Sequence, residues 1–464
     1  MRPVLTVGEM NAVDARGLQS MPIDQLVARA GFAVAMAAVD MLGGAYGRRV
    51  VVIAGRGNNG ADGRVAAAVL TARGARVRLV GPEHDAAIGR VDLVIDAAYG
   101  TGFRGSYETP GVPEGTKVLA VDIPSGVEGD TGHASGSVLA ADRTVTFVAA
   151  KPGLVQGDGL TLAGSVSVVD IGLPTGPAAI WVMEDADVAD LVPTRSRGGN
   201  KWSAAVLVVA GSPGMTGAAA LSTRAAYRSG AGMVRLGVPG GKLSDSPMSE
   251  AVGVSLESGD WADDALEAAS RCAAVVVGPG LGRNDATAAQ VRALVAGSPV
   301  PVVVDADGLY ALGELQGRGP IDARSTVVLT PHDGEYQRLM GEKPGADRIR
   351  AARRLAEASG AVALLKGPTT AVAGADGHVL LGMTGTARLA TAGTGDVLSG
   401  VIGALMARGV DPHEAAALAA HVHGRAAERG RAVGLVAGDL PELVSDVLAS
   451  LCPPAPARNP GTDG

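Results

Sequence analysis

The sequence predicts an α/β protein of two domains, and three observations support this fold class. The chain has 464 residues, whereas a single domain commonly holds roughly 100–200 residues. Short runs of Val, Ile and Leu are followed by Gly-containing turns and Ala- or Leu-rich helical stretches, which is the βαβ pattern of a parallel sheet. This pattern stops in a Pro-rich polar stretch and then begins again. We therefore expect domains at 1–194 and 195–452 and a disordered tail at 453–464.

In the first domain, apolar runs without alternation predict strands that are covered on both faces. We expect these strands at 50–54, 77–80, 93–95 and 118–121, with helices at 23–42 and 64–73.

The second domain repeats the pattern. We expect strands at 205–210, 274–277, 302–304, 327–329 and 363–365, and a helix at 216–228. Two further apolar runs, 370–372 and 379–381, flank Asp376-Gly377, a strong signal for a two-residue hairpin. The hairpin predicts an antiparallel edge on an otherwise parallel sheet.

Composition narrows the functional classes. Hydrophobic residues make up 47% of the chain and charged residues 19%, which argues against disorder. The net charge of −7 provides no basic field, so we expect no nucleic-acid partner. The chain begins without a signal-peptide pattern, and no stretch of about 20 apolar residues is expected to cross a membrane. Two distant cysteines, Cys272 and Cys452, suit a reducing compartment, so a cytoplasmic location is expected.

A glycine turn in the second domain predicts a phosphate site. Gly393-Thr394-Gly395-Asp396 opens a stretch with helical spacing of apolar residues at 397, 398, 401, 402, 405 and 406. Backbone N–H groups at such a helix start, together with the helix dipole, attract an anion. A carboxylate there would repel phosphate unless it faces the reacting group, which suggests proton transfer by Asp396. The alternative is that Asp396 only caps the helix.

Other polar segments follow predicted strands of the same domain, where open α/β sheets bind ligands. Lys366–Thr370 supplies a lysine and hydroxyl groups, and Thr330–Glu335 supplies a titratable cluster. Asp305-Ala306-Asp307 also follows a predicted strand, the one at 302–304. Gly278–Gly282 would bring bare backbone to a ligand, although Gly-Pro-Gly can also be an ordinary turn.

These segments, together with the 210–219 loop, occur in the order found in the ADP-dependent NAD(P)H-hydrate dehydratases, which the second domain resembles. The resemblance implies a ribokinase-like α/β domain. It implies that ADP is lined by 386–395 and by these residues: Lys366, Gly367, Pro368, Thr369, Thr370, Gly393, Thr394 and Gly395. It places four residues on the side of the hydrated nicotinamide: Ala218, Gly282, His332 and Asp396.

The first domain has its own glycine turn after the strand at 50–54. Gly55, Gly57 and Gly60 match a dinucleotide fingerprint, which is a weak signal alone. The polar residues Asn58, Asn59 and Asp62 are more informative, because side-chain oxygens at a strand end can hold a cation or ribose hydroxyls. An Asn-Gly turn with a helix cap is the alternative.

Polar residues follow two more strands of the first domain. Asp96, Asp122 and Ser125 could converge with Asn59 on one rim, and such a group of oxygens suggests a monovalent cation.

With the motif Asp122-Ile123-Pro124-Ser125-Gly126, the first domain resembles the NAD(P)H-hydrate epimerases. The resemblance implies a Rossmann-like three-layer sandwich, K⁺ held by Asn59, Asp96 and Ser125, and Asp122 as the acid/base residue. It implies substrate contacts from Asn58, Asn59, Gly60, Ala61, Asp62, Gly100, Thr101, Gly102, Phe103, Arg104, Gly105, Ser106 and Asp122. Ala61 replaces a glycine that is usual in that family.

Together the two resemblances imply a bifunctional repair enzyme whose small-molecule substrate is NAD(P)H hydrate. One domain would interconvert the R and S epimers, and the other would dehydrate the S epimer with ADP as phosphoryl donor and Mg²⁺ bound with the nucleotide. A homo-oligomer is implied. The alternatives are a ribokinase-like kinase of a small alcohol and a first domain that only binds a ligand.

Overall fold

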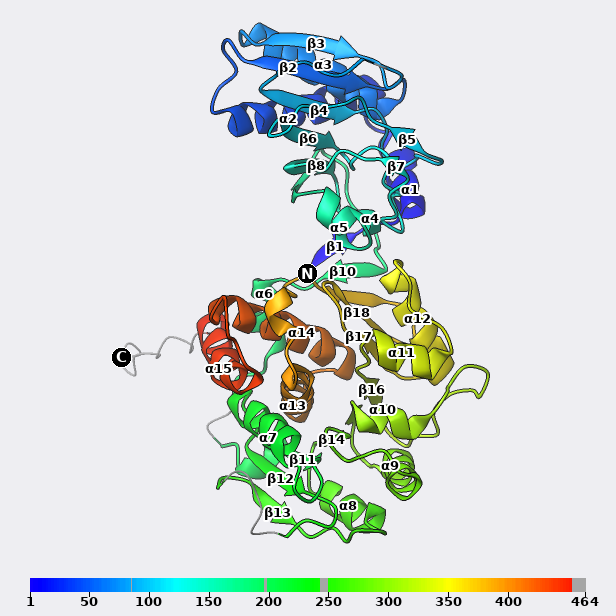
Figure 1. The fold of residues 1–464 in the computed structure, drawn as a ribbon, viewed down its shortest axis with the longest axis vertical. Coiled ribbons are helices and arrows are strands. Elements are labelled where there is room, and N and C mark those ends of the chain that lie inside the picture. The colour runs from blue at the N-terminus through cyan, green and yellow to red at the C-terminus, as the bar shows by residue number, and fades with distance from the viewer. Residues whose placement is uncertain (85, 196–197, 243–248, 453–464) are drawn as a thin grey trace, which may run out of the picture. The chain divides into compact units, whose positions relative to one another are not determined.

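The computed structural model describes residues 1–84, 86–195, 198–242 and 249–452, so the predicted disordered tail lies outside the described residues. The chain divides into two compact units (Figure 1). The N-terminal unit consists of Arg2–Trp181 with Gly345–Arg348, and the C-terminal unit holds Val182–Pro344 and the chain from Ile349 onward.

The change of unit therefore falls at 181/182 and not at the predicted 194/195. The prolines that suggested the boundary, Pro174, Pro177 and Pro193, flank this segment on both sides. Between them, helix α6 (Asp185–Leu191) contacts α14 and α15 of the C-terminal unit. The packing of α6, which composition does not reveal, decides the boundary.

A parallel sheet of six strands forms the N-terminal unit, in the order β3-β2-β4-β6-β8-β9. Its strands are β2 (Arg49–Ala54), β3 (Arg76–Val80), β4 (Leu93–Ala97), β6 (Lys117–Val121), β8 (Arg143–Phe147) and β9 (Ser165–Val169). Its helices are α1 (Val7–Gly17), α2 (Ile23–Leu42), α3 (Asn58–Ala72), α4 (Pro152–Val155) and α5 (Gly159–Leu162), and its short strands are β1 (Arg2–Val4), β5 (Tyr107–Glu108) and β7 (Gly136–Ser137). The four predicted strands are confirmed.

Both faces of this sheet are covered, as predicted for three layers. Helices α1, α2 and α3 pack on one face through a core that includes Leu26, Val34 and Leu70. The other face is covered by residues such as Ile88 and Tyr107, which lie outside the helices. The second outer layer is therefore built largely from loops.

Helix α2 corrects one prediction. With 20 residues it is long and apolar enough to cross a membrane by length and composition, contrary to the expectation from the sequence. Several of its apolar side chains, including Leu26 and Val34, are buried against the sheet and α3, whereas Ile23 and Phe32 are exposed. Burial in a protein core and burial in lipid select the same residue types, which explains why α2 passes this test.

The C-terminal unit has a mixed sheet in the order β19-β18-β17-β16-β15-β14-β11-β12-β13. Its strands are β11 (Ala205–Val209), β12 (Met233–Gly237), β13 (Val252–Val254), β14 (Ala274–Val277), β15 (Val302–Val304), β16 (Val327–Leu329), β17 (Val362–Leu365), β18 (Thr370–Ala373) and β19 (Val379–Gly382); β10 (Ile180–Val182) spans the change of unit. Strands β17 to β19 are antiparallel, and the other pairs are parallel. The predicted antiparallel edge is confirmed.

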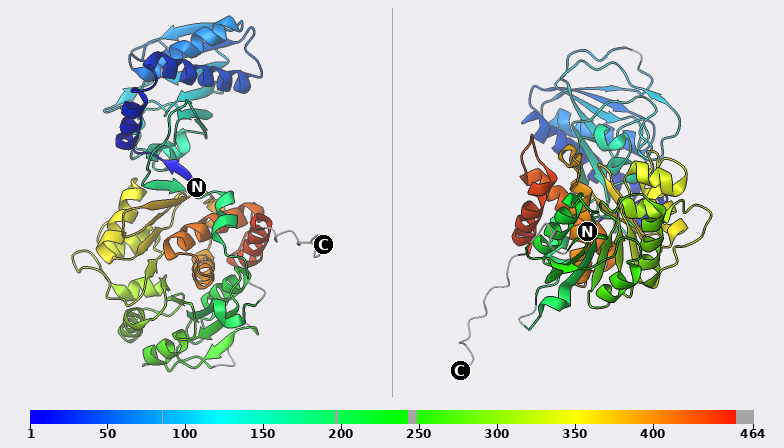
Figure 2. Two further views of the ribbon diagram at one scale, coloured as in Figure 1. Left: turned by 180° about the vertical axis from the view of Figure 1, so that it is seen from behind. Right: turned by 60° about the horizontal axis from the view of Figure 1, so that its bottom comes forward.

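Helices lie on both faces of this sheet (Figure 2). One layer contains α7 (Gly217–Arg228), α13 (Thr394–Ala407), α14 (Pro412–Arg429) and α15 (Leu440–Leu451). Besides α6, the unit also contains α8 (Ala262–Ala269), α9 (Asp285–Gly297), α10 (Asp307–Leu312), α11 (Asp333–Met340) and α12 (Arg348–Ser359). Helix α13 is buried along nearly its whole length against β11, β14 and β15, which fixes its N-terminus over the sheet.

The first turn of α3 brings the backbone of Gly60 against that of Gly55, and this yields a prediction. A Cβ on Gly60 would lie 1.9 Å from the carbonyl oxygen of Gly55. We expect Gly60→Ala to lower the free energy of unfolding by about 1–3 kcal/mol, because the backbone must move. Urea unfolding curves measure this, with Gly57→Ala as the matched control, since a Cβ on Gly57 meets nothing within 4 Å. If both variants lose the same free energy of unfolding, the close approach of Gly60 to the Gly55 carbonyl oxygen is not what requires glycine.

Candidate active sites

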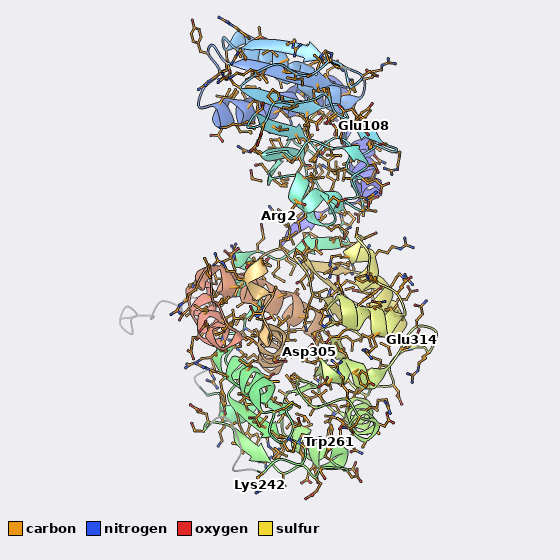
Figure 3. All side chains as sticks on the ribbon, viewed as in Figure 1. Arg2, Glu108, Lys242, Trp261, Asp305 and Glu314 are labelled. Atoms are coloured by element: carbon orange, nitrogen blue, oxygen red, sulfur yellow. The ribbon has the colours of Figure 1, made fainter. Side chains whose placement is uncertain are left out.

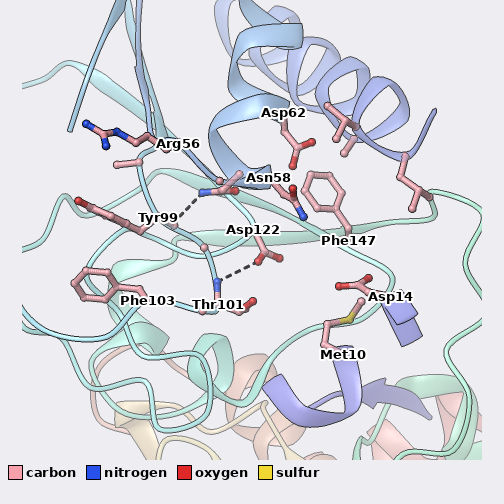
Figure 4. Close-up of a pocket in the computed structure, with 18 of the residues that line it drawn as sticks. Met10, Asp14, Arg56, Asn58, Asp62, Tyr99, Thr101, Phe103, Asp122 and Phe147 are labelled. Atoms are coloured by element: carbon pink, nitrogen blue, oxygen red, sulfur yellow. Dashed lines mark hydrogen bonds between the residues drawn. The ribbon is translucent and has the colours of Figure 1, made fainter. Parts of the chain in front are cut away.

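The N-terminal unit contains a cavity of about 670 Å³ at the carboxyl ends of its central strands. Asn58 and Asp62 reach it from α3, Asp122 from the loop after β6 and Asp14 from α1 (Figure 4). Of the residues predicted to contact substrate, those lining it are Asn58, Asn59, Asp62, Gly100, Thr101, Gly102, Phe103 and Asp122. Gly60, Ala61, Arg104, Gly105 and Ser106 are outside this lining. Helix α3 begins at Asn58, six residues before the predicted helix, so the polar segment of the turn is itself helical.

Asp122 is the centre of a hydrogen-bonded group in this cavity. Its Oδ1 lies 2.6 Å from Lys151 Nζ and accepts a hydrogen bond of 3.0 Å from Thr146 Oγ1. The Lys151 side chain is only 2% exposed and also donates to Thr146 Oγ1 and to the Phe147 carbonyl. Burial acts to raise the pKa of Asp122, but the Lys151 ammonium outweighs it and the pKa is lowered. Asp122 is therefore held ionised.

The backbone of Asp122 is unusual. Its φ of 66° lies in the left-handed region, which costs a non-glycine residue of the order of 1 kcal/mol or more. Aspartate and asparagine tolerate this conformation better than other residues. The conformation turns the carboxylate at the strand end toward the cavity.

The sequence reasoning missed Lys151. The residue follows β8, whose sequence Arg-Thr-Val-Thr-Phe alternates polar and apolar residues and was not interpreted as a strand. The lysine after this short alternating run, in Lys151-Pro152-Gly153, is the signal that could have identified it.

Two further carboxyl groups face the cavity. Burial, and then the negative charge of Asp122, raise the pKa of Asp62 to about 8. Burial is also the largest cause of the raised pKa of Asp14. Within the described part of the chain, no hydrogen-bond donor or cation partners the Asp62 carboxyl group, which is 7% exposed.

The three predicted cation ligands lie together beside this cavity. Ser125 donates to both carboxylate oxygens of Asp96, at 2.6 Å from Oγ and 2.8 Å from N. Asn59 Nδ2 and Ser125 Oγ both donate to the Tyr99 carbonyl, which links Asn59 to the pair. Asn59 Oδ1 is buried and has no hydrogen-bond partner among the described atoms. Asp96 is completely buried, and burial raises its pKa despite the hydrogen bonds from Ser125. A bound cation would satisfy both the orphaned oxygen and the buried carboxylate.

In the C-terminal unit, the predicted lysine lies between Asp305, which is labelled in Figure 3, and the predicted glycine turn. Lys366 Nζ lies 2.7 Å from Asp305 Oδ1, and Ser399 Oγ donates to Asp305 Oδ2 at 2.6 Å. Burial acts to raise the pKa of Asp305, but Lys366 lowers it. A Cβ on Gly395 would lie 3.1 Å from Lys366 Nζ, so the ammonium lies directly against the glycine turn.

Asp396 is in the first turn of α13, as predicted. Gly393 precedes it as the helix N-cap with a φ of 90°, and no side chain caps the helix. Burial, and then the negative charge of Asp305, raise the pKa of Asp396 to about 6. The structure does not support the alternative in which Asp396 only caps the helix, because no capping hydrogen bond from a side chain is made there.

The other predicted residues of this unit border the same region. Gly282 N donates to Asp307 Oδ2 at 2.9 Å, and Arg283 pairs with Asp307. His332 caps α11, since its Nδ1 accepts from Gly334 N at 3.0 Å. A Cβ on Gly280 would lie 3.1 Å from the Ala218 Cβ, which places Ala218 beside the 278–282 turn. Ala306, between Asp305 and Asp307, has a φ of 50°, so strained backbone occurs here as it does at Asp122.

Comparison with known proteins identifies both units. Residues 206–449 match the family model described as NAD(P)H-hydrate dehydratase, and residues 23–88 and 81–153 match the YjeF-related protein N-terminus. The bifunctional NAD(P)H-hydrate repair enzyme of Salinibacter ruber is 38% identical, and the alignment covers 96% of each chain. The chain belongs to the bifunctional NAD(P)H-hydrate repair enzymes.

The repair enzyme of Escherichia coli is 32% identical over 93% of this chain and 90% of its own. A crystal structure of the ADP/ATP-dependent NAD(P)H-hydrate dehydratase of Bacillus subtilis, co-crystallised with ATP and Mg²⁺, is similar to 58% of this chain with 28% identity and a TM-score of 0.50, and 98% of that chain is covered. The predicted family, the ribokinase-like C-terminal fold and the predicted bifunctional activity are confirmed. In this repair enzyme the N-terminal unit is the epimerase unit and the C-terminal unit is the dehydratase unit.

Proposed function

We propose that this repair enzyme assigns one reaction to each acidic strand-end site. Asp122 serves epimerisation of NAD(P)H hydrate in the epimerase unit, and Asp396 serves ADP-dependent dehydration of the S epimer in the dehydratase unit. The observation that carries the proposal is that each unit has a lysine–aspartate ion pair at its strand ends. Lys151 pairs with Asp122 in the epimerase unit, and Lys366 pairs with Asp305 beside the glycine turn that precedes Asp396 in the dehydratase unit. Each unit thus has the parts for its own proton transfer.

In the dehydratase unit, Asp396 takes the proton of the substrate hydroxyl as that oxygen attacks the terminal phosphoryl group of ADP. AMP leaves. The C–O bond of the phosphorylated intermediate then breaks while the neighbouring ring carbon loses a proton to the departing phosphate, and this restores the double bond of NAD(P)H. The backbone N–H groups of 393–395 face the transferring phosphoryl group from the start of α13. Lys366, positioned by Asp305, neutralises its charge. Ala218, Gly282 and His332 border the nicotinamide.

The nucleotide is held by Lys366–Thr370 together with the glycine turn. Mg²⁺ in such sites usually takes one or two protein carboxylates and completes its shell with phosphate oxygens and water. Among the described residues, no group of three or more His, Cys, Asp or Glu side chains is arranged so that it could hold a metal ion. ATP and Mg²⁺ in the Bacillus subtilis crystal support the use of a nucleotide with Mg²⁺.

In the epimerase unit, K⁺ fits the oxygens of Asn59, Asp96 and Ser125. The buried, unpartnered Asn59 Oδ1 and the fully buried Asp96 carboxylate are the features that favour it. When bound, the cation supplies positive charge that fixes the 99–103 loop through the shared Tyr99 carbonyl. The lining residues of 58–62 and 100–103 then contact the substrate, with Asp122 facing its nicotinamide end.

The potassium site gives a testable expectation. We expect Asn59→Leu to raise the K⁺ concentration needed for half-maximal epimerisation at least tenfold, because one ligand oxygen is lost. K⁺ should raise the melting temperature of the parent chain but not of this variant, since ligands stabilise only a state that binds them. Titration of KCl against choline chloride at constant ionic strength measures both. Asn58→Leu is the matched control and should retain the parent's K⁺ requirement; an unchanged requirement in Asn59→Leu contradicts the site.

One assay tests the function as a whole. The full chain is supplied with S hydrate and ADP or ATP, and then with R hydrate, while the absorbance of the reduced nicotinamide is followed. We expect NAD(P)H to return from the S hydrate with nucleotide, and from the R hydrate faster than spontaneous epimerisation allows. No return with either nucleotide would overturn the dehydratase assignment, and a stable phosphorylated product would indicate a kinase.

A further inference from the structure

The epimerase cavity contains a carboxyl group for which the assignments above provide no chemical role. Asp62 points into the cavity from α3, close to the residues around Asp122 (Figure 4). It is 7% exposed, and no described donor or cation partners it. The charged or titratable side chains that line the cavity are Asp14, Arg56, Asp62, Glu83, Tyr99, Asp122 and Lys151.

Charge within the cavity separates the two aspartates. The Lys151 ammonium lies 2.6 Å from the Asp122 carboxylate and stabilises its ionised form, so Asp122 is negatively charged in the resting protein. Asp62 has no such partner, and a second bare carboxylate near the first would be buried and repelled. The site therefore holds an ionised aspartate, Asp122, and a protonated one, Asp62. A reaction that removes a proton from one substrate atom and adds a proton to another needs such a pair of groups.

Resting on the proposed epimerase function, we propose that Asp62 is the proton donor to the ring nitrogen and Asp122 the base for the hydroxyl. The hydrate is a hemiaminal: its hydroxyl-bearing carbon is bonded to the ring nitrogen. Asp122 takes the hydroxyl proton, and the electrons of the O–H bond form the C=O double bond. The C–N bond breaks, and its electron pair goes to the ring nitrogen. The nitrogen then takes a proton from Asp62. The ring opens to an aldehyde and an N–H group.

Ring closure reverses these transfers. After rotation of the aldehyde, the nitrogen attacks the opposite face of the carbonyl carbon and returns its proton to Asp62. The carbonyl oxygen regains a proton from Asp122. The R and S epimers thus interconvert, and both aspartates end in their starting states without an oxidant, a reductant or a further reactant. Lys151 is a positioning residue, because it acts through Asp122.

The decisive variant is Asp62→Asn, which resembles the protonated carboxyl group in size and charge but supplies no acidic proton. We expect the epimerisation rate to fall by about 100-fold or more. In the parent chain the rate should also fall as pH rises through about 8, the pKa of Asp62, because the donor is then ionised. Asp62→Asn should lose this alkaline decrease, which a purely structural role would leave in place.

Both reactions are measured on the same chain. Circular dichroism and the melting temperature report folding of each variant, because dehydration of the S hydrate reports only the dehydratase unit. Asp24→Asn, an exposed carboxyl of α2 outside the cavity, is the control with parent rates. A pH titration of ¹³C-labelled aspartate by NMR measures the protonation of Asp62 independently of turnover.

If Asp62→Asn keeps both the rate and the alkaline decrease, the inference is wrong. If Asp14→Asn alone loses the decrease, Asp14 is the donor and the inference is again wrong. If the parent chain does not epimerise at all, the proposed function itself fails.

Discussion

Asp396→Asn is expected to reduce dehydration of the S hydrate by about 10²–10⁴-fold, the usual contribution of a general base. Asparagine keeps the size of the side chain at the start of α13 but cannot accept the hydroxyl proton. The KM for ADP should change little, because the backbone N–H groups of 393–395 remain. The measurement is the ADP-dependent return of absorbance at saturating S hydrate, with epimerisation by the same chain as an internal standard.

The matched control is Asp285→Asn. Asp285 is an exposed aspartate in the first turn of α9 in the same unit, so its removal tests whether any negative charge at a helix start matters. Its dehydratase rate should match that of the parent. A rate for Asp396→Asn within threefold of the control would show that Asp396 is not the base.

The same residue determines the acidic side of the dehydratase pH profile. Burial and Asp305 raise the pKa of Asp396 to about 6. The base acts only when ionised, so dehydration should increase as pH rises through about 6 and then level off. The profile of kcat/KM between about pH 5 and pH 8 checks this. An acidic limb near pH 4, the ordinary range of an aspartate, would contradict the buried environment.

Asp122→Asn is expected to have the second large effect, a loss of about 100-fold or more in epimerisation with dehydration unchanged. Asparagine tolerates the left-handed φ of 66° at this position, so the backbone can persist. The variant leaves the buried Lys151 ammonium without its carboxylate, which commonly destabilises a protein by about 3–5 kcal/mol. A lost activity could then reflect a lost fold.

A double variant separates these causes. Asp122→Asn with Lys151→Met removes both charges and should recover most of the melting temperature, since a neutral pair of similar volume replaces a buried ion pair. We expect it to remain inactive in epimerisation. Recovery of the epimerase rate together with stability would show that Asp122 has only a structural role.

Most of the parallel strands were predictable because buried strands are short, continuous apolar runs. Val302–Val304 and Val327–Leu329 have the predicted bounds. Strand β8 was missed because threonines alternate with its apolar residues, although Thr144 and Thr146 are themselves completely buried. Hydrogen bonds of Thr144 to the Ala163 carbonyl and of Thr146 to Lys151 and Asp122 allow this burial. Such partners are tertiary and have no local sequence signal.

Site residues could be predicted where they follow parallel strands, because the carboxyl ends of these strands lie at the same edge of the sheet. The approach of Asn59, Asp96 and Ser125 followed from parallel strands that end at one edge of the sheet. The pairing of Lys366 with Asp305, 61 positions apart in the sequence, did not follow from any pattern. The pKa values of Asp62 and Asp396 depend on burial by distant segments, which the motifs around them do not encode.

The two lysines at these sites differ in how far solvent reaches them. The Lys151 side chain is 2% exposed and that of Lys366 is 21% exposed, although each ammonium is bound by an aspartate at close range. A small amine-acylating reagent therefore reaches the dehydratase lysine and is shielded from the epimerase lysine. Brief acylation should silence one reaction of the chain and spare the other, and peptide mass mapping would locate the modified side chain.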